Sequence, residues 1–66
     1  MVGGHYIVAG AQVLGETRAG TVLRDGRVLE VDLCASLPIR IEYTTPGGDK
    51  RIERFAPNEF KMFRRL

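Results

Sequence analysis

The stretch TVLRDGRVLEVDL, residues 21–33, decides the fold that this sequence predicts. At its centre the pair Asp25-Gly26 separates two runs of β-prone residues. An Asp-Gly pair in this position favours a tight hairpin, because a type I′ turn needs positive φ at both central residues. We therefore expect residues 21–23 and 28–33 to form the two arms of a β-hairpin.

The second arm of this hairpin has one apolar and one charged face. Leu29, Val31 and Leu33 alternate with Glu30 and Asp32, which is the period of a half-buried strand. Two carboxylates on one strand face can bind a cation. Charged side chains are mostly exposed, however, and we interpret this pair as part of a solvated face.

Residues 39–44 show the clearest alternation in the chain. Ile39, Ile41 and Tyr43 alternate with polar residues, so one face of this strand is expected in the core. The Pro-Gly-Gly segment within residues 45–49 then predicts a turn.

The chain returns from this turn as a strand over residues 50–55. Ile52 and Phe55 break strict alternation within it. We expect either a bulge near residues 53–54 or a strand that ends at Phe55, because either would place both apolar side chains inside.

Both ends of the chain contribute short elements. Apolar runs at residues 5–8 and 11–14 are separated by a glycine and predict strand structure. Residues 56–60 are too few for a stable α-helix. Pro57 lacks the N–H that a first-turn residue need not donate, so we expect one 3-10 turn there. Residues 61–66 then form the last strand.

These alternations assign the inner faces of the strands. The residues expected in the core are Val13, Val22, Leu29, Val31, Leu33, Ile39, Ile41, Tyr43, Ile52 and Phe55. Phe60, with Met62 or Phe63, is expected to fill the end of this core, because large apolar residues usually lie inside.

Length and composition indicate one small domain, residues 1–66, with residues 1–4 flexible. The single cysteine, Cys34, excludes an intrachain disulfide and a cysteine-rich zinc site, and it suits a reducing cytoplasm. The longest apolar run is far below the roughly 20 residues of a membrane span. The first residues lack the basic region of a signal peptide. We expect a cytoplasmic protein without a membrane association or a small-molecule cofactor.

The expected order of elements resembles a known class of small barrels. Residues 55–63, with a proline and an asparagine before a large apolar residue, resemble the segment that Src-homology-3 barrels place before their last strand. The front half is similar to KOW and Tudor-type barrels at Gly10, Val13, Gly20, Val22 and Val31. The resemblance covers residues 9–64. It implies an all-β fold, a small five- or six-stranded Src-homology-3-like (SH3-like) barrel with a 3-10 turn before the last strand.

Catalytic chemistry has little support in this sequence. His5 is the only histidine, so one chain cannot build a multi-histidine metal site. A lone cysteine such as Cys34 is most often a small buried hydrophobe. In size and strand order the chain is similar to the plasmid-borne dihydrofolate reductases, which place an active site in a pore between four chains. Residues 39–43 differ from their pore strand, so no catalytic residue is carried over. An oligomeric enzyme is the third hypothesis, and we predict no enzyme.

Nucleic-acid binding is the second hypothesis. The net charge is +2, and residues 34–66 hold seven basic against four acidic residues, a mild excess for a nucleic-acid binder. A phosphate between Arg24 and Arg27 at the expected hairpin tip would accept hydrogen bonds from both. The candidate contacts to a nucleic acid or an acidic partner are Arg24, Arg27, Lys50, Arg51, Arg54, Lys61, Arg64 and Arg65.

Protein–protein interaction is the preferred hypothesis. The assignment of inner faces leaves Leu14, Leu23 and Val28 outside, near one hairpin, where they would form an apolar patch. An open barrel edge would add strand pairing. We therefore predict a non-enzymatic binding, adaptor or regulatory protein, whose partner is another protein or a second copy of this chain.

Overall fold

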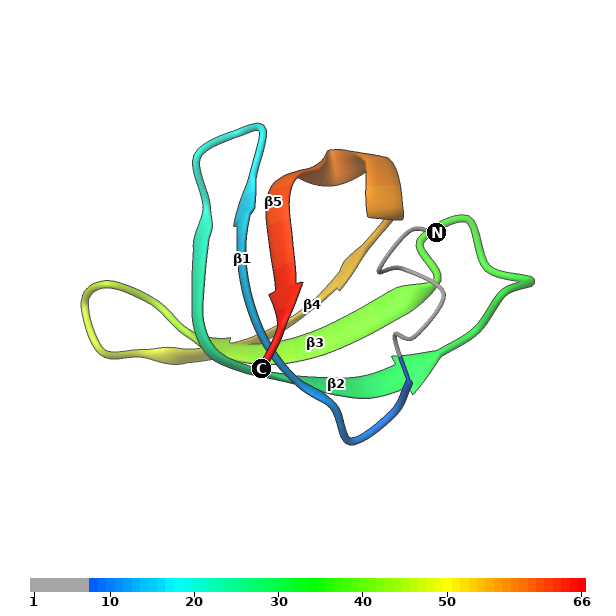
Figure 1. Cartoon of the computed structure of the whole chain (residues 1–66), viewed down its shortest axis with the longest axis horizontal. Helices are drawn as coiled ribbons and strands as arrows, with labels where there is room; N and C mark the ends of the chain where they lie inside the picture. The colour runs from blue at the N-terminus through cyan, green and yellow to red at the C-terminus, as the bar shows by residue number, and fades with distance from the viewer. Residues whose placement is uncertain (1–7) are drawn as a thin grey trace.

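Residues 8–66, the part of the chain that the computed structural model describes, form five strands and one 3-10 turn (Figure 1). In chain order the elements are β1 (Gln12–Thr17), β2 (Val22–Val31), β3 (Ile39–Thr44), β4 (Lys50–Phe55), the 3-10 turn Pro57–Glu59 and β5 (Phe60–Arg65). The all-β class and the 3-10 turn before the last strand are therefore confirmed. The predicted flexible residues 1–4, and the predicted strand at residues 5–8 apart from Val8, lie outside the described part.

The five strands make one antiparallel sheet in the order β4-β3-β2-β1-β5. The strands β4 and β5 occupy its two ends and do not pair with each other, so the sheet of residues 8–66 is curled but not closed. In Figure 1 the long strand β2 runs from the half that contains β1 and β5 to the half that contains β3 and β4. The result is an open, barrel-like sheet with two free edges.

The predicted hairpin at Asp25-Gly26 is wrong, because β2 runs through both residues without turning back. Against β1 the pairing passes from Val13↔Gly26 to Gly15↔Leu23, which leaves one extra residue in β2. The pairing of β2 with β3 shifts by one residue at the same place. Asp25 has a φ of 50°, in the left-handed region where aspartate is tolerated. The Asp-Gly pair is therefore a β-bulge that bends one strand.

The irregular pairing of β2 also overturns the predicted outer patch. Leu23 and Val28 are both 0% exposed and belong to the core. A second extra residue, Leu29, shifts the pairing with β3 again between Val28 and Glu30. Beyond each extra residue, the side chains that pointed to one face of the strand point to the other. A simple alternation that ignores the two bulges therefore assigns Leu23 and Val28 to the outer face, although both are buried. Leu33, which was predicted inside, lies beyond the end of β2 and is 86% exposed.

The core that results lies between the two halves of the curled sheet. Its buried members are Ala11, Val13, Leu23, Val28, Ile39, Ile41, Tyr43, Phe55 and Phe60. Val31 and Phe63 are partly buried and pack against it. Val22 and Leu29, both predicted inside, are only half-buried.

The hairpin between β3 and β4 is confirmed. Ile39, Ile41 and Tyr43 all face the core, as their alternation predicts. The turn is closed by a hydrogen bond that the backbone N–H of Thr45 donates to the carbonyl oxygen of Asp49, at 2.7 Å.

Candidate interaction surfaces

The strand β4 forms one free edge of the sheet. It pairs with β3 residue by residue, from Thr44↔Lys50 to Ile39↔Phe55, without a bulge. Of the two predicted alternatives, the strand that ends at Phe55 is therefore correct. Ile52 was predicted inside but faces outward and is 57% exposed. No described strand pairs with the other side of β4, and an unpaired edge can take up a further strand.

The backbone groups of Lys50, Ile52 and Arg54 point away from β3. Hydrogen-bonded and non-hydrogen-bonded pairs alternate along an antiparallel ladder, and the alternation can be counted from the bond between Thr45 and Asp49. Counted in this way, the odd-numbered positions of β4 bond to β3. The even-numbered positions direct their N–H and C=O groups to the free edge.

The inner face of β4 carries an ion pair instead of an apolar pair. The register places Arg51 opposite Tyr43, and Glu53 opposite Ile41. Arg51 Nη1 lies 3.8 Å from Glu53 Oε2, and the two side chains are 59% and 43% exposed. A pair this exposed contributes little to stability, so this ion pair does not prevent either group from contacting a partner.

Tyr43 gives this face a measurable pH dependence. Burial, followed by the negative charge of Glu53 and its hydrogen bond with the phenol, raises the pKa of Tyr43, which Arg51 opposes. The unfolded value is about 10. The contribution of the protonated Tyr43 phenol to the unfolding free energy is therefore fully present below about pH 10. It is lost as the pH rises through the higher pKa of the folded state. We expect Tyr43→Phe to flatten the fall in unfolding free energy above pH 10. Urea unfolding of both proteins across this range checks it, and parallel pH profiles would contradict it.

A row of aromatic side chains connects the two free edges at one end. The ring centroids of Tyr43 and Phe55 are 6.2 Å apart, those of Phe55 and Phe60 5.2 Å, and those of Phe60 and Phe63 4.6 Å. These residues come from β3, β4 and β5, so ring packing bridges a gap that no backbone ladder crosses. Phe55 and Phe60 are buried, which confirms the prediction that these aromatic residues fill the core.

A pocket of about 430 Å³ lies at the corner beside this aromatic row. Its lining residues are Thr17, Arg18, Ala19, Thr21, Glu53, Arg54, Phe55, Asn58 and Glu59. Arg18 donates from its backbone N–H to the Glu59 carbonyl at 2.8 Å and from Nε to the Asn58 carbonyl at 3.0 Å. Glu59 Oε2 accepts a bond from the backbone N–H of Ala56 at 2.7 Å. The two bonds from Arg18 attach the β1–β2 turn to the 3-10 turn, and the bond to Glu59 closes the 3-10 turn itself. The main polar groups of the pocket are therefore already used in hydrogen bonds within the chain.

The outer face of β2, β3 and β4 carries rows of charged side chains. Near the β3–β4 turn, Thr44 pairs with Arg24 on one side and with Lys50 on the other. In the next row Glu42 lies opposite Arg27. Neither Arg24 nor Lys50 has an ion-pair partner within residues 8–66. Three of the predicted basic residues therefore share this face, although no hairpin tip brings the two arginines together.

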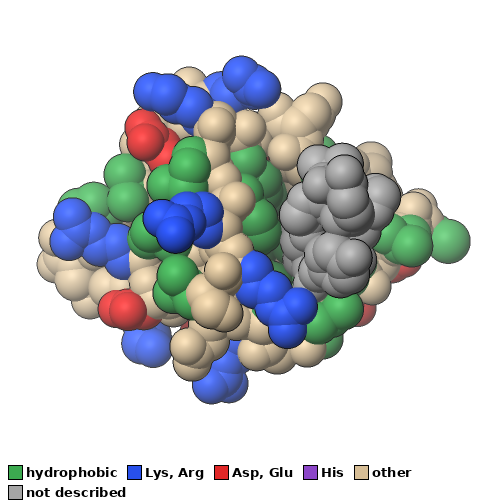
Figure 2. Space-filling model, viewed as in Figure 1, with side chains coloured by type: hydrophobic (Ala, Val, Ile, Leu, Met, Phe, Trp, Pro, Cys, Tyr) green, Lys and Arg blue, Asp and Glu red, His purple; other side chains and the backbone are tan. Residues whose placement is uncertain are grey.

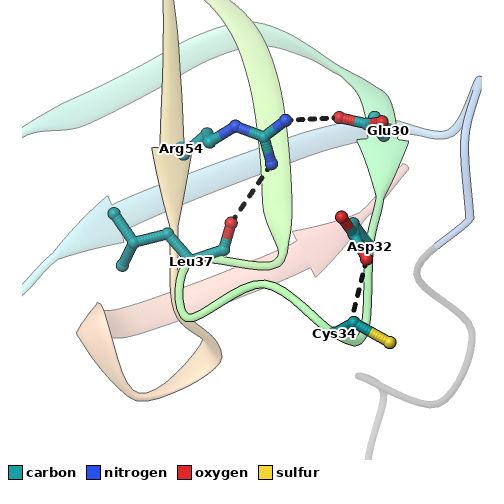
Figure 3. Close-up of polar contacts among 5 residues, drawn as sticks. All are labelled: Glu30, Asp32, Cys34, Leu37 and Arg54. Atoms are coloured by element: carbon teal, nitrogen blue, oxygen red, sulfur yellow. Dashed lines mark hydrogen bonds and ion pairs between the residues drawn. The ribbon is translucent and has the colours of Figure 1, made fainter.

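Arg54 is on the same outer face but is engaged within the chain (Figure 3). Its Nη2 lies 2.6 Å from Glu30 Oε1, and its Nη1 donates to the carbonyl oxygen of Leu37 at 3.4 Å. In the same loop the backbone N–H of Cys34 donates to Asp32 Oδ1 at 3.0 Å. Arg54 thus fastens the β2–β3 loop. Cys34 was predicted to be buried and is exposed, because the loop holds it beyond the sheet.

The other predicted basic residues lie on β5. Arg64 pairs with Leu14 and Arg65 with Val13, and Lys61 is the extra residue of a bulge. Leu14 is half-buried and is all that remains at the surface of the predicted apolar patch. On the face that carries β1 and β5, Figure 2 shows Lys and Arg side chains in several separate places with apolar side chains between them. The eight predicted contacts therefore do not form one continuous surface.

Three further observations bear on the kind of protein this is. Within residues 8–66 no group of three His, Cys, Asp or Glu side chains is placed to hold a metal ion, and His5 lies outside that range. That part of the chain also contains no helix that is long and apolar enough to cross a membrane. Comparison of the sequence and structure with protein families, with curated proteins and with solved structures found no match.

Proposed function

We propose that this chain is a non-enzymatic binding module that acts through protein–protein interaction, as an adaptor or a regulator, with the β4 edge as its binding element. The observation that carries the proposal is an unpaired strand with Ile52 57% exposed on it. An extended partner segment would add to this edge as the next strand. Backbone hydrogen bonds would then supply affinity, and alternate side chains would supply specificity.

The class of fold and the compartment belong to the same proposal. The strand order β4-β3-β2-β1-β5, with a 3-10 turn between β4 and β5, supports grouping the chain with the Src-homology-3-like barrels, of KOW or Tudor type, that its sequence resembles. The single cysteine supports a reducing compartment such as the cytoplasm.

Selection of displayed random peptides against the full chain tests the proposed edge. Ile52→Pro removes an N–H that points away from β3, and proline is tolerated at such an edge position. We expect this change to weaken selected peptides about 10- to 100-fold, because a peptide carbonyl loses its donor. Ile52→Ala is the matched control, since it shortens the side chain and keeps the N–H. Peptides that bind equally well to the Pro variant would disprove the edge as the binding element.

A polyanion such as nucleic acid is the second candidate partner. Arg24 and Lys50 lie opposite Thr44 on its two neighbouring strands and have no ion-pair partner within residues 8–66. Anisotropy titrations with a DNA duplex and a single strand, at about 50 and about 200 mM salt, would show the salt dependence of phosphate contacts. Replacing both residues by alanine should then weaken binding more than the control Lys61→Ala with Arg64→Ala. Equal losses would contradict this site.

A further inference from the structure

The free edge of β4 is complementary to itself. Its sequence from Lys50 to Arg54 has Ile52 at the centre, Arg51 before it and Glu53 after it. When two such strands lie antiparallel with Ile52 opposite Ile52, Arg51 of each copy lies opposite Glu53 of the other. We propose that the partner of this edge is a second copy of this chain, paired in that register about a two-fold axis through Ile52. The proposal rests on the proposed function, for which it names the partner.

The backbone permits this register. Lys50, Ile52 and Arg54 direct their N–H and C=O groups to the edge, as the alternation from the Thr45–Asp49 bond shows. With Ile52 on the axis, Lys50 meets Arg54 of the second copy and Ile52 meets Ile52. In every such pair, the N–H and C=O groups that point to the free edge of one copy face those of the other copy and can form hydrogen bonds. A shift by one residue would set them against groups that are already bonded to β3.

The side chains favour this register over its neighbours. On the inner face it forms two Arg51–Glu53 ion pairs between copies, and on the outer face it covers Ile52, which is 57% exposed in one chain. With Glu53 on the axis, two glutamates would be opposed, and with Arg51 there, two arginines. Like charges directly opposite destabilise a strand pair. Of these three registers, only the Ile52-centred one has no like charges on the axis and places Arg51 opposite Glu53 on both sides of it.

Charged side chains often protect sheet edges from pairing, and the outer face contains one such element. Lys50 of one copy lies opposite Arg54 of the other. Glu30 lies 2.6 Å from Arg54 in each chain, however, and offsets this repulsion. The within-chain Arg51–Glu53 contact is long, at 3.8 Å, so little of that ion pair is lost when both groups turn to the second copy, although Glu53 also interacts with the Tyr43 phenol. An edge of six residues makes a small interface, and we expect a reversible, concentration-dependent dimer.

Charge reversal tests the pairing directly. In Arg51→Glu, two glutamates oppose two glutamates across the axis, and in Glu53→Arg, arginines oppose arginines. Sedimentation velocity over a concentration series should show a wild-type dimer and, for each variant alone, a dissociation constant at least about 100-fold higher. An equimolar mixture of the two variants should associate again, because every opposed pair in the mixed dimer is then glutamate with arginine. Circular dichroism of each variant confirms that it is folded.

Recovery in the mixture supports the proposal, because loss of structure in either variant would not be reversed by the other. A wild-type chain that stays monomeric, or folded variants whose mixture stays monomeric, overturns it. If the wild type is monomeric but selected peptides bind in a manner sensitive to Ile52→Pro, the edge is the binding element and only the identity of the partner is wrong. If both experiments fail, the proposed function fails with the dimer.

Discussion

Gly26→Ala is expected to destabilise the protein by about 3 kcal/mol or more, at the upper end of overpacking in a close-packed core. A Cβ atom at this position would lie 2.9 Å from Val13 Cγ2 and 3.0 Å from the carbonyl oxygen of Val13. The side chain of Val13 can rotate at a cost, but its carbonyl is part of β1, so β1 and β2 would have to separate. A chain of 66 residues has a total stability of roughly 3–10 kcal/mol, and this loss removes a large part of it.

Chemical denaturation of the two proteins measures the effect. Gly47→Ala is the matched control, because the nearest atom to its added Cβ would be 3.7 Å away, in ordinary contact. We expect that control to stay within about 1 kcal/mol of the wild type. A Gly26→Ala protein that unfolds at the same denaturant concentration as the control would show that β1 does not approach β2 as closely as the structure places it.

Gly26 also explains why the strongest turn signal in the sequence was misleading. A type I′ turn needs positive φ at both central residues, whereas here Asp25 has a φ of 50° and Gly26 does not lie in the left-handed region. Local sequence therefore indicates an unusual backbone conformation at Asp25, but neither the conformation of Gly26 nor the role of the pair in the sheet. The role is set by pairing with β1 and β3, which are distant in the sequence. The buried positions of Leu23 and Val28 follow from that pairing.

Elements that depend on local rules were predictable. The strand β3 follows its alternation, the turn after it has the proline and glycines that such turns use, and Pro57 begins the 3-10 turn.

Which side chains of β4 face the core was predictable only in part. Counting back by twos from Phe55 places Glu53 and Arg51 on the inner face and Ile52 on the outer face. The sequence-based prediction instead placed Ile52 inside, because an apolar residue is expected in the core before two charged ones. A free edge tolerates that arrangement because its inner face is only partly covered.

The basic residues show the corresponding limit for the candidate site. Their type is evident from the sequence, but their distribution is not, since it depends on the strand order and on ion pairs between strands. Arg54 is engaged by Glu30 across β3, whereas Arg24 and Lys50 are in one row with no such partner among residues 8–66. A charge count treats these three residues as equal, and the structure does not.

Phe60→Ala is expected to leave most of the chain unfolded at 25 °C. The side chain is 8% exposed, and its ring packs at 5.2 Å from that of Phe55 and at 4.6 Å from that of Phe63. Truncating a buried phenylalanine costs about 3–5 kcal/mol, and the loss of two ring pairs adds to this. The place of Phe60 between β4 and β5 adds to the effect of the lost side-chain volume, because these two strands share no backbone ladder. Phe60 links these strands through ring contacts, and with an alanine there only the 3-10 turn and its hydrogen bonds to Arg18 connect the two halves of the sheet at that end.

Near-ultraviolet and far-ultraviolet circular dichroism with urea titration measures this loss. Met62→Ala is the control on the same strand, because Met62 is 38% exposed and pairs with Glu16 away from the ring cluster. We expect that control to change stability by less than about 1 kcal/mol. Phe60→Leu should fall between the two, since it keeps most of the apolar volume and loses the ring contacts. A Phe60→Ala protein that is as stable as the Met62→Ala protein would mean that the open sheet is held by its backbone ladders alone, and that the aromatic row adds nothing to its stability.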